Sequence, residues 1–182
     1  MEKFLVFGIL TIPIVIISWR TLFNIKTHGF YRFFAWEGIL WLAINNYKYW
    51  FDYPLSLLQI FSWILLSYSL LLLILGILQL IKFGKPHESR NEKALFNIEK
   101  TTILVDEGIF KYIRHPIYGS LIFLTWGIFF KSTNLELLLI SIASTVLLYI
   151  TAKFDEKECI VYFGESYRKY MTLNKMFIPY IM

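Results

Sequence analysis

Uncharged apolar runs, separated by short polar segments, dominate this chain. The longest extends from Pro54 to Ile81, 28 residues without a charged side chain. A helix needs about 20 predominantly apolar residues to cross the hydrocarbon core of a bilayer. This segment therefore predicts a membrane-spanning helix that is long enough to tilt.

Four shorter apolar runs predict further helices. Phe4–Trp19 carries no charge and indicates a retained anchor, because no small-residue cleavage site of a signal peptide follows it. Phe33–Tyr47 carries Glu37 and has aromatic flanks typical of a membrane interface, so it spans the bilayer or lies in the interface. Ile117–Phe130 and Leu137–Ala152 flank a polar turn and predict a helical hairpin. The expected fold is all-α, a polytopic helical membrane protein with four or, preferably, five spans in one domain, residues 1–182.

Composition agrees with a membrane protein and argues against several other classes. Apolar residues make up 57% of the chain and the mean hydropathy is +0.57, whereas soluble domains are about 45–50% apolar. The single cysteine, Cys159, excludes an internal disulfide framework, and the three histidines lack a metal-ligand spacing, so no metal is expected. The net charge of +5 comes from loops rather than a surface stripe, so no nucleic-acid partner is expected.

The distribution of lysine and arginine predicts an orientation. With five spans, the polar segments 20–32, 82–116 and 153–182 lie on one side of the membrane and hold three, seven and five cations. Only three cations, Lys3, Lys48 and Lys131, lie on the other side. The positive-inside rule then places the N-terminus outside and the C-terminus in the cytoplasm.

The first candidate for chemistry is the pair His115-Pro116, at the mouth of an apolar run. Proline is favoured in the first turn of a helix, so a helix is expected to begin at Pro116 or Ile117. The N–H groups of a helix start bind anions, and Arg114 adds a donor suited to a carboxylate or phosphate. Alone, Arg114 and Lys111 are typical interfacial anchors and His115 is typical of a structural histidine.

The second candidate is the acidic pair Asp155 and Glu156, which follows the last apolar run on the same predicted membrane face. These carboxylates could coordinate a cation, bind ribose hydroxyls, or pair with Arg114 or Lys111. Neither a glycine-rich phosphate loop nor the nucleophile elbow of a hydrolase occurs in the sequence.

Two segments carry a resemblance to a known family. They read "LVDEGIFKYIRHPIYGS" and "DEKECIVYFGESYRKY". In order and spacing they resemble the membrane methyltransferases that include isoprenylcysteine carboxyl methyltransferases and phospholipid methyltransferases. The resemblance covers roughly residues 82–182, so residues 1–81 are assigned to N-terminal membrane helices. Phe110 replaces a tyrosine of the pattern, and Asp155 replaces its first glutamate.

The resemblance implies that the C-terminal half binds S-adenosylmethionine at the cytoplasmic face, with S-adenosylhomocysteine as product. Carried over by position, the residues lining the cofactor pocket would be Gly108, Phe110, His115 and Tyr118, with Asp155 and Glu156 closing it. Tyr167 and Tyr170 match the trailing tyrosines of the second segment.

The reaction expected is methyl transfer to a lipid-like or prenylated acceptor, most simply carboxyl O-methylation of an isoprenylcysteine-type substrate. Arg114 could orient an ionised carboxylate, whereas an amine or thiol would need a base, for which Glu156 is the best candidate. Phospholipid N-methylation and thiol S-methylation remain alternatives. A non-enzymatic scaffold would use the basic loops to bind anionic lipid. A transporter is disfavoured, because Glu37 is an isolated ionisable group within the spans.

Overall fold

The computed structural model describes residues 1–90 and 95–179, and this part of the chain is helical without a β-strand. Lys93, one of the predicted cytoplasmic cations, lies outside the described residues. The α-helices are α1 (Glu2–Ser18), α2 (His28–Asn46), α3 (Leu57–Gly84), α4 (Pro116–Phe129), α5 (Leu135–Phe163) and α6 (Glu165–Leu173). Three short 3₁₀ turns are η1 (Tyr47–Tyr49), η2 (Asn97–Glu99) and η3 (Gly108–Lys111).

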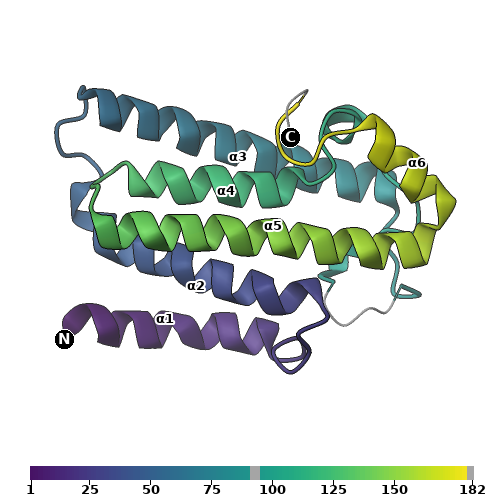
Figure 1. The fold of residues 1–182 in the computed structure, drawn as a ribbon, viewed down its shortest axis with the longest axis horizontal. Helices are drawn as coiled ribbons and strands as arrows, with labels where there is room; N and C mark the ends of the chain where they lie inside the picture. Colours follow the sequence, from purple (N-terminus) through teal and green to yellow (C-terminus); the bar gives the residue numbers. More distant parts are fainter. Residues whose placement is uncertain (91–94, 180–182) are drawn as a thin grey trace.

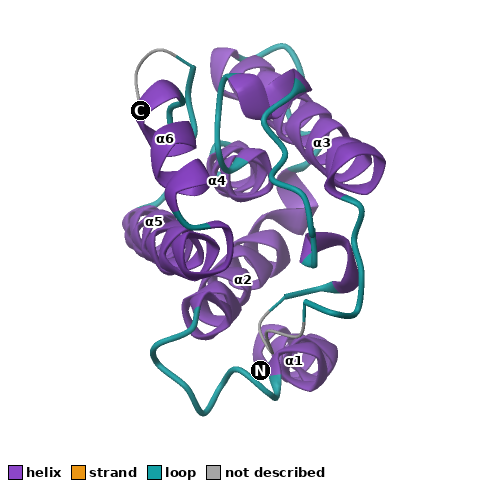
Figure 2. Cartoon of the chain, turned by 90° about the vertical axis from the view of Figure 1, so that its right-hand side faces the viewer, coloured by secondary structure: helices purple, strands orange, loops and turns teal. Residues whose placement is uncertain are grey.

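The five longer helices lie side by side, and α6 covers one end of the bundle (Figure 1). Helix α3 packs on α4, and α2 packs on α5. Helix α1 lies at the edge of the bundle against α2 (Figure 2). The described part is therefore all-α, as predicted.

Local sequence signals determine where these helices begin and end. Helix α4 begins at Pro116, as predicted, and the Asn134 side chain caps α5 by accepting a hydrogen bond from the Leu137 N–H at 2.8 Å. Helix α5 continues beyond the apolar run and ends at Phe163, before Gly164 with φ +62°. Because left-handed backbone suits glycine, Gly164 separates α5 from α6.

A stripe of small residues joins α3 to α4. Ser62, Ser69 and Gly76 recur every seven residues, so they share one face of α3. The Ser62 hydroxyl donates to the Gly127 carbonyl at 2.6 Å, and the Ser69 hydroxyl donates to the Ser120 carbonyl at 2.7 Å. Close backbone approach through small residues is typical of helix pairs in membranes. This contact fixes α4, and with it the position of its N-terminus.

Two helices in the described ranges, α3 and α5, are long and apolar enough to cross a membrane. They make a membrane protein plausible. Helices α1, α2 and α4 occupy the places predicted for the other spans, and five spans stay a prediction.

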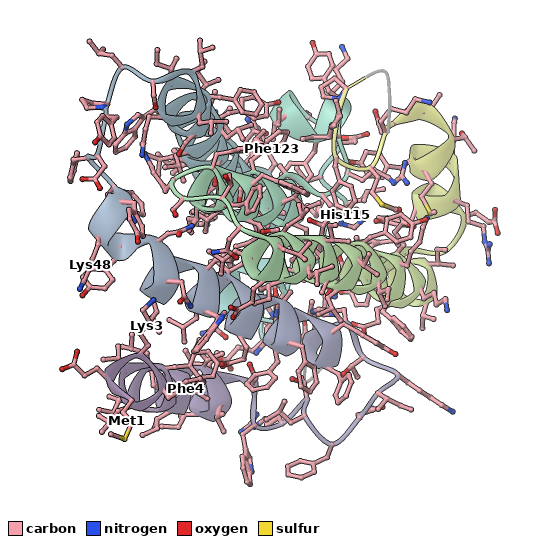
Figure 3. All side chains as sticks on the ribbon, turned by 60° about the vertical axis from the view of Figure 1, so that its left-hand side comes forward. Met1, Lys3, Phe4, Lys48, His115 and Phe123 are labelled. Carbon is pink, nitrogen blue, oxygen red and sulfur yellow. The ribbon has the colours of Figure 1, made fainter. Side chains whose placement is uncertain are left out.

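The predicted basic segments gather at one end of the bundle. The loop between α1 and α2, the connector between α3 and α4, and α6 lie at the right-hand end in Figure 1. Lys48 lies at the opposite end of the bundle. His115 lies inside the bundle, toward the end with the basic segments (Figure 3). The candidate site is therefore at the basic end.

Candidate active site

The backbone around Arg114 and His115 is held by the C-terminal segment. The Arg114 N–H donates to the Lys175 carbonyl at 2.7 Å, and the His115 N–H donates to the Met176 carbonyl at 3.0 Å. Ile113, fully buried, forms an isolated parallel bridge with Lys175. The residues that follow α6 thus fix the entry to α4.

His115 is the N-cap residue of α4, and its ring lies between the two predicted carboxylates. Its Nδ1 is 3.4 Å from Asp155 Oδ2, and its Nε2 is 3.5 Å from Glu156 Oε1. Nε2 is buried and faces Glu156 as an ion-pair contact, without a hydrogen bond among the described residues.

The electrostatic environment of His115 favours its charged form. Burial lowers the pKa of the imidazole, but the two neighbouring carboxylates, Asp155 and Glu156, raise it more, so the pKa lies above its ordinary value. The ring also stacks on Tyr118, with centroids 5.5 Å apart.

The sequence left three roles open for Asp155 and Glu156: cation coordination, binding of ribose hydroxyls, and ion pairing. In the structure, Glu156 forms ion pairs. Its Oε1 accepts from Arg114 Nε at 2.9 Å and Nη2 at 2.7 Å, and its Oε2 accepts from Lys153 Nζ at 2.9 Å. Arg114 also donates through Nη1 to the carbonyls of Met171 and Asn174. Lys111, the other cation considered as a partner of the acidic pair, is exposed.

A pocket opens beside His115 and encloses about 90 Å³. Of the residues predicted for the site, five line it: Phe110, Arg114, His115, Tyr118 and Asp155. Glu156 lies behind His115 and is not among the lining residues. Gly108 has φ +58°, and a side chain there would collide with Gln79, so this glycine shapes the turn that leads to the pocket.

Several lining residues were not expected from the sequence. They are Arg90, Glu99 and Thr101 of the connector and Cys159 and Phe163 of α5. Arg90 is 2% exposed, donates to the Thr101 carbonyl at 3.1 Å, and stacks on Tyr162 at 4.4 Å. The connector has the composition of a charged linker, so nothing in the sequence around Arg90 indicates that its side chain is buried.

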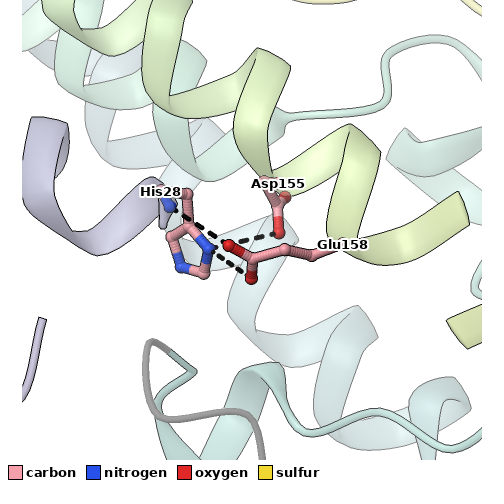
Figure 4. Close-up of side chains that lie close together, drawn as sticks. All are labelled: His28, Asp155 and Glu158. Atoms are coloured by element: carbon pink, nitrogen blue, oxygen red, sulfur yellow. Dashed lines mark hydrogen bonds and ion pairs between the residues drawn. The ribbon is translucent and has the colours of Figure 1, made fainter. Parts of the chain in front are cut away.

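A second unexpected group joins α2 to α5. His28 Nδ1 lies 2.8 Å from Glu158 Oε2 and 4.0 Å from Asp155 Oδ1 (Figure 4). One ligand atom from each of the three residues lies within 4.8 Å of the others, a geometry that could hold a cation. Arg32 Nη1, however, is 3.5 Å from His28 Nε2 and places a positive charge beside this trio.

A separate apolar groove of about 420 Å³ lies among α3, α4, α5 and the C-terminal segment. Its lining comprises Phe61, Leu65, Ile122, Phe123, Trp126, Phe130, Thr145, Tyr149, Phe177 and Ile178. The ring centroids of Phe177 and His115 are 6.2 Å apart. One end of the groove therefore lies near the site.

Residues 69–166 match the phospholipid methyltransferase family, a match over more than half of the chain. The chain belongs to this family. This phospholipid methyltransferase family member carries every predicted site residue, from Gly108 to Glu156, inside the matched region. His28 and Arg32 lie outside it, as do Tyr167 and Tyr170.

Two curated relatives are methanethiol methyltransferases. The methanethiol S-methyltransferase of Pseudomonas deceptionensis is 28% identical over 71 residues, which are 39% of this chain and 26% of the relative. The methanethiol S-methyltransferase 1 of Bradyrhizobium diazoefficiens is 29% identical over 72 residues, 40% of this chain and 25% of the relative. The matched part thus spans about a quarter of the length of these relatives. No solved structure matches the chain.

Proposed function

We propose that this protein is an S-adenosylmethionine-dependent methyltransferase that acts at a membrane on a lipid-like acceptor. The observation that carries the proposal is the position of His115. It caps α4, lies between Asp155 and Glu156, and lines a pocket with aromatic walls. Perturbed ionisable groups in a pocket are typical of functional sites.

The residues present suit S-adenosylmethionine chemically. The free N–H groups of the first turn of α4 suit the carboxylate of the cofactor. Asp155 suits the ribose hydroxyls, and the faces of Phe110 and Tyr118 suit a sulfonium. The enclosed volume of about 90 Å³ is below the roughly 300–1,000 Å³ of ordinary ligand sites, so its walls would separate on binding.

When bound, the cofactor supplies an electrophilic methyl group on sulfur. The protein then has to align that group with the acceptor and exclude water, and alignment alone can contribute roughly 7–11 kcal/mol to a barrier. Arg114 and His115 are fixed by the C-terminal segment and by the two carboxylates, so they enter the reaction already positioned.

The apolar groove supports a lipid-like or prenylated acceptor. It borders two helices that could span a membrane, and Phe177 brings one end close to His115. An isoprenoid or acyl chain in the groove would present its polar head near the cofactor pocket. We therefore favour carboxyl O-methylation of an isoprenylcysteine-type substrate, with Arg114 orienting the carboxylate.

Thiol S-methylation is the second candidate, because the relatives are named for methanethiol. N-methylation of a phospholipid follows from the family description. Either nucleophile must lose a proton in the reaction, and Glu156 is engaged by Arg114 and Lys153. Releasing Glu156 as a base would break one of these pairs, whereas a carboxylate acceptor needs no base.

We further propose that five helices span the membrane, with the N-terminus outside and the C-terminus in the cytoplasm. The gathering of the basic segments at the end of the bundle that holds the site supports this orientation.

The test is calorimetric titration of the detergent-purified protein with S-adenosylmethionine and S-adenosylhomocysteine. Saturable binding is expected, together with its loss in His115→Ala and its retention in the matched control His87→Ala, an exposed histidine of the connector. Transfer of a labelled methyl group to prenylcysteine, phosphatidylethanolamine or methanethiol then identifies the acceptor. A folded protein that binds neither compound would favour the scaffold alternative.

A further inference from the structure

Two buried polar side chains reach the candidate site from the N-terminal half of the chain. His28 is 0% exposed and Arg32 is 5% exposed. They are four residues apart on α2, so they lie on one face of that helix. Both precede the region that matches the family, and neither belongs to the motifs noted in the sequence.

His28 holds the α5 wall of the site. Its backbone N–H donates to Glu158 Oε1 at 3.1 Å, and its ring Nδ1 is 2.8 Å from Glu158 Oε2. The same ring nitrogen lies 4.0 Å from Asp155 Oδ1, while Asp155 Oδ2 lies 3.4 Å from His115. The Asp155 carboxylate therefore lies between two imidazoles, one from each half of the chain; Figure 4 shows the one from His28.

Arg32 holds the connector wall of the site. Its Nη1 donates to both oxygens of Glu99, at 3.3 and 3.1 Å. Its guanidinium also lies over the ring of Phe96 at 4.2 Å. Glu99 lines the pocket and accepts a further hydrogen bond from the Phe96 N–H at 2.9 Å. The η2 turn is thus clamped to α2.

The contacts favour hydrogen bonding over metal binding at His28. His28 Nδ1 lies at hydrogen-bond distance, 2.8 Å, from Glu158 Oε2, and Arg32 Nη1 lies 3.5 Å from His28 Nε2. A divalent cation among His28, Asp155 and Glu158 would be repelled by the guanidinium next to it. Arg32 and His28 thereby form one polar chain from Glu99 to Glu158.

We infer that His28 and Arg32 are positioning residues of the cofactor pocket. His28 sets the position of Asp155, and Arg32 sets the position of Glu99. Helix α2 thereby positions two pocket-lining residues that lie within the region matching the family. The inference rests on the proposed function, because the pocket is taken to bind S-adenosylmethionine. Neither residue needs to touch the cofactor.

The first test compares His28→Ala and His28→Asn with the wild type in full-length protein in detergent. Asparagine keeps an N–H donor near the place of Nδ1. His28→Ala should weaken S-adenosylmethionine binding about tenfold or more, and His28→Asn should recover most of the affinity. The KM for the acceptor should stay unchanged, and the control Lys26→Ala, an exposed cation before α2, should bind like the wild type.

The second test is a double-mutant cycle with Arg32→Ala, Glu99→Ala and the double variant. If Arg32 acts through Glu99, the double variant should bind S-adenosylmethionine with no lower affinity than the single variant that binds it less tightly. Arg32→Lys should rescue poorly, because lysine cannot make the planar stack on Phe96. Additive losses would overturn this part of the inference.

Melting temperatures and a chelator complete the design. Wild-type protein that fails to bind S-adenosylmethionine would refute the proposed function. If the wild type binds and His28→Ala binds within about twofold of it, the positioning role is refuted. The role is also refuted if the affinities of the variants simply follow their melting temperatures, or if EDTA lowers wild-type affinity, which would assign the trio to a metal.

Discussion

Arg114 and Glu156 meet through two hydrogen bonds that end on a single carboxylate oxygen, with Nε and Nη2 at 2.9 and 2.7 Å from Oε1. The Glu156 side chain is buried, at 3% exposed, and the Arg114 side chain is nearly so, at 9% exposed. The same guanidinium donates to the carbonyls of Met171 and Asn174, at the C-terminal end of α6. This ion pair therefore connects α5, the residues that enter α4, and the end of α6. Losing one partner would leave the other charge buried.

Breaking this pair from one side should therefore destabilise the protein. Glu156→Leu is expected to cost about 3–5 kcal/mol of unfolding free energy, the usual effect of orphaning a buried ion. The double variant Arg114→Met with Glu156→Leu should be more stable than the single variant, because no charge is then unpaired. Thermal denaturation in detergent measures both, and a double variant as unstable as the sum of the singles would contradict this account.

His115 should make stability depend on pH. Its folded-state pKa is raised above the ordinary value of about 6.5, because the gain from Asp155 and Glu156 exceeds the cost of burial. Its stabilising contribution is then complete below about pH 6.5 and is lost as pH rises through the raised pKa. The melting temperature should fall across that interval.

His115→Gln should flatten this dependence, whereas His87→Gln, at an exposed position, should leave it unchanged. Part of the slope should persist through His28. Burial lowers the pKa of His28, but its hydrogen bond to Glu158 and the charge of Asp155 raise it above its ordinary value. An unchanged slope in His115→Gln would show that the two carboxylates do not hold this proton.

Packing between α3 and α4 should control the site from a distance. A side chain at Gly76 would begin 3.0 Å from Ile117 and 3.3 Å from Pro116, at the start of α4. Gly76→Leu should therefore displace that helix start, costing about 1–3 kcal/mol of stability and weakening cofactor binding. Gly8→Leu in α1 is the matched control, since no atom lies within 4 Å of its added Cβ. Equal calorimetric affinities in the two variants would contradict the expected coupling.

Filling the apolar groove should affect the acceptor alone. Leu65 lines the groove, whereas Leu71 on the same helix is 50% exposed. Leu65→Trp should raise the KM for a prenylated acceptor without changing the affinity for S-adenosylmethionine, and Leu71→Trp should change neither. A Leu65→Trp variant with normal acceptor kinetics would place the acceptor elsewhere.

Helix positions followed from the sequence, because the signals are local. The uncharged run from Pro54 to Ile81 marks α3, and Pro116 marks the start of α4. The motif around His115 also led to the family, since motif order and spacing are properties of the chain alone. Length and polarity, however, do not decide how many of the helices enter a membrane.

Which side chains meet was decided by the tertiary structure. Arg114 and Glu156 are 42 residues apart, and His28 and Glu158 are 130 apart. Hydrophobic periodicity shows which face of a helix is buried, but it does not name the partner across the interface. The small-residue stripe on α3 and the pairing of α2 with α5 set the helices at their final positions. That packing brings Glu156 to Arg114 and His28 of α2 against α5. It also places Arg90 and Glu99 of the connector around the pocket.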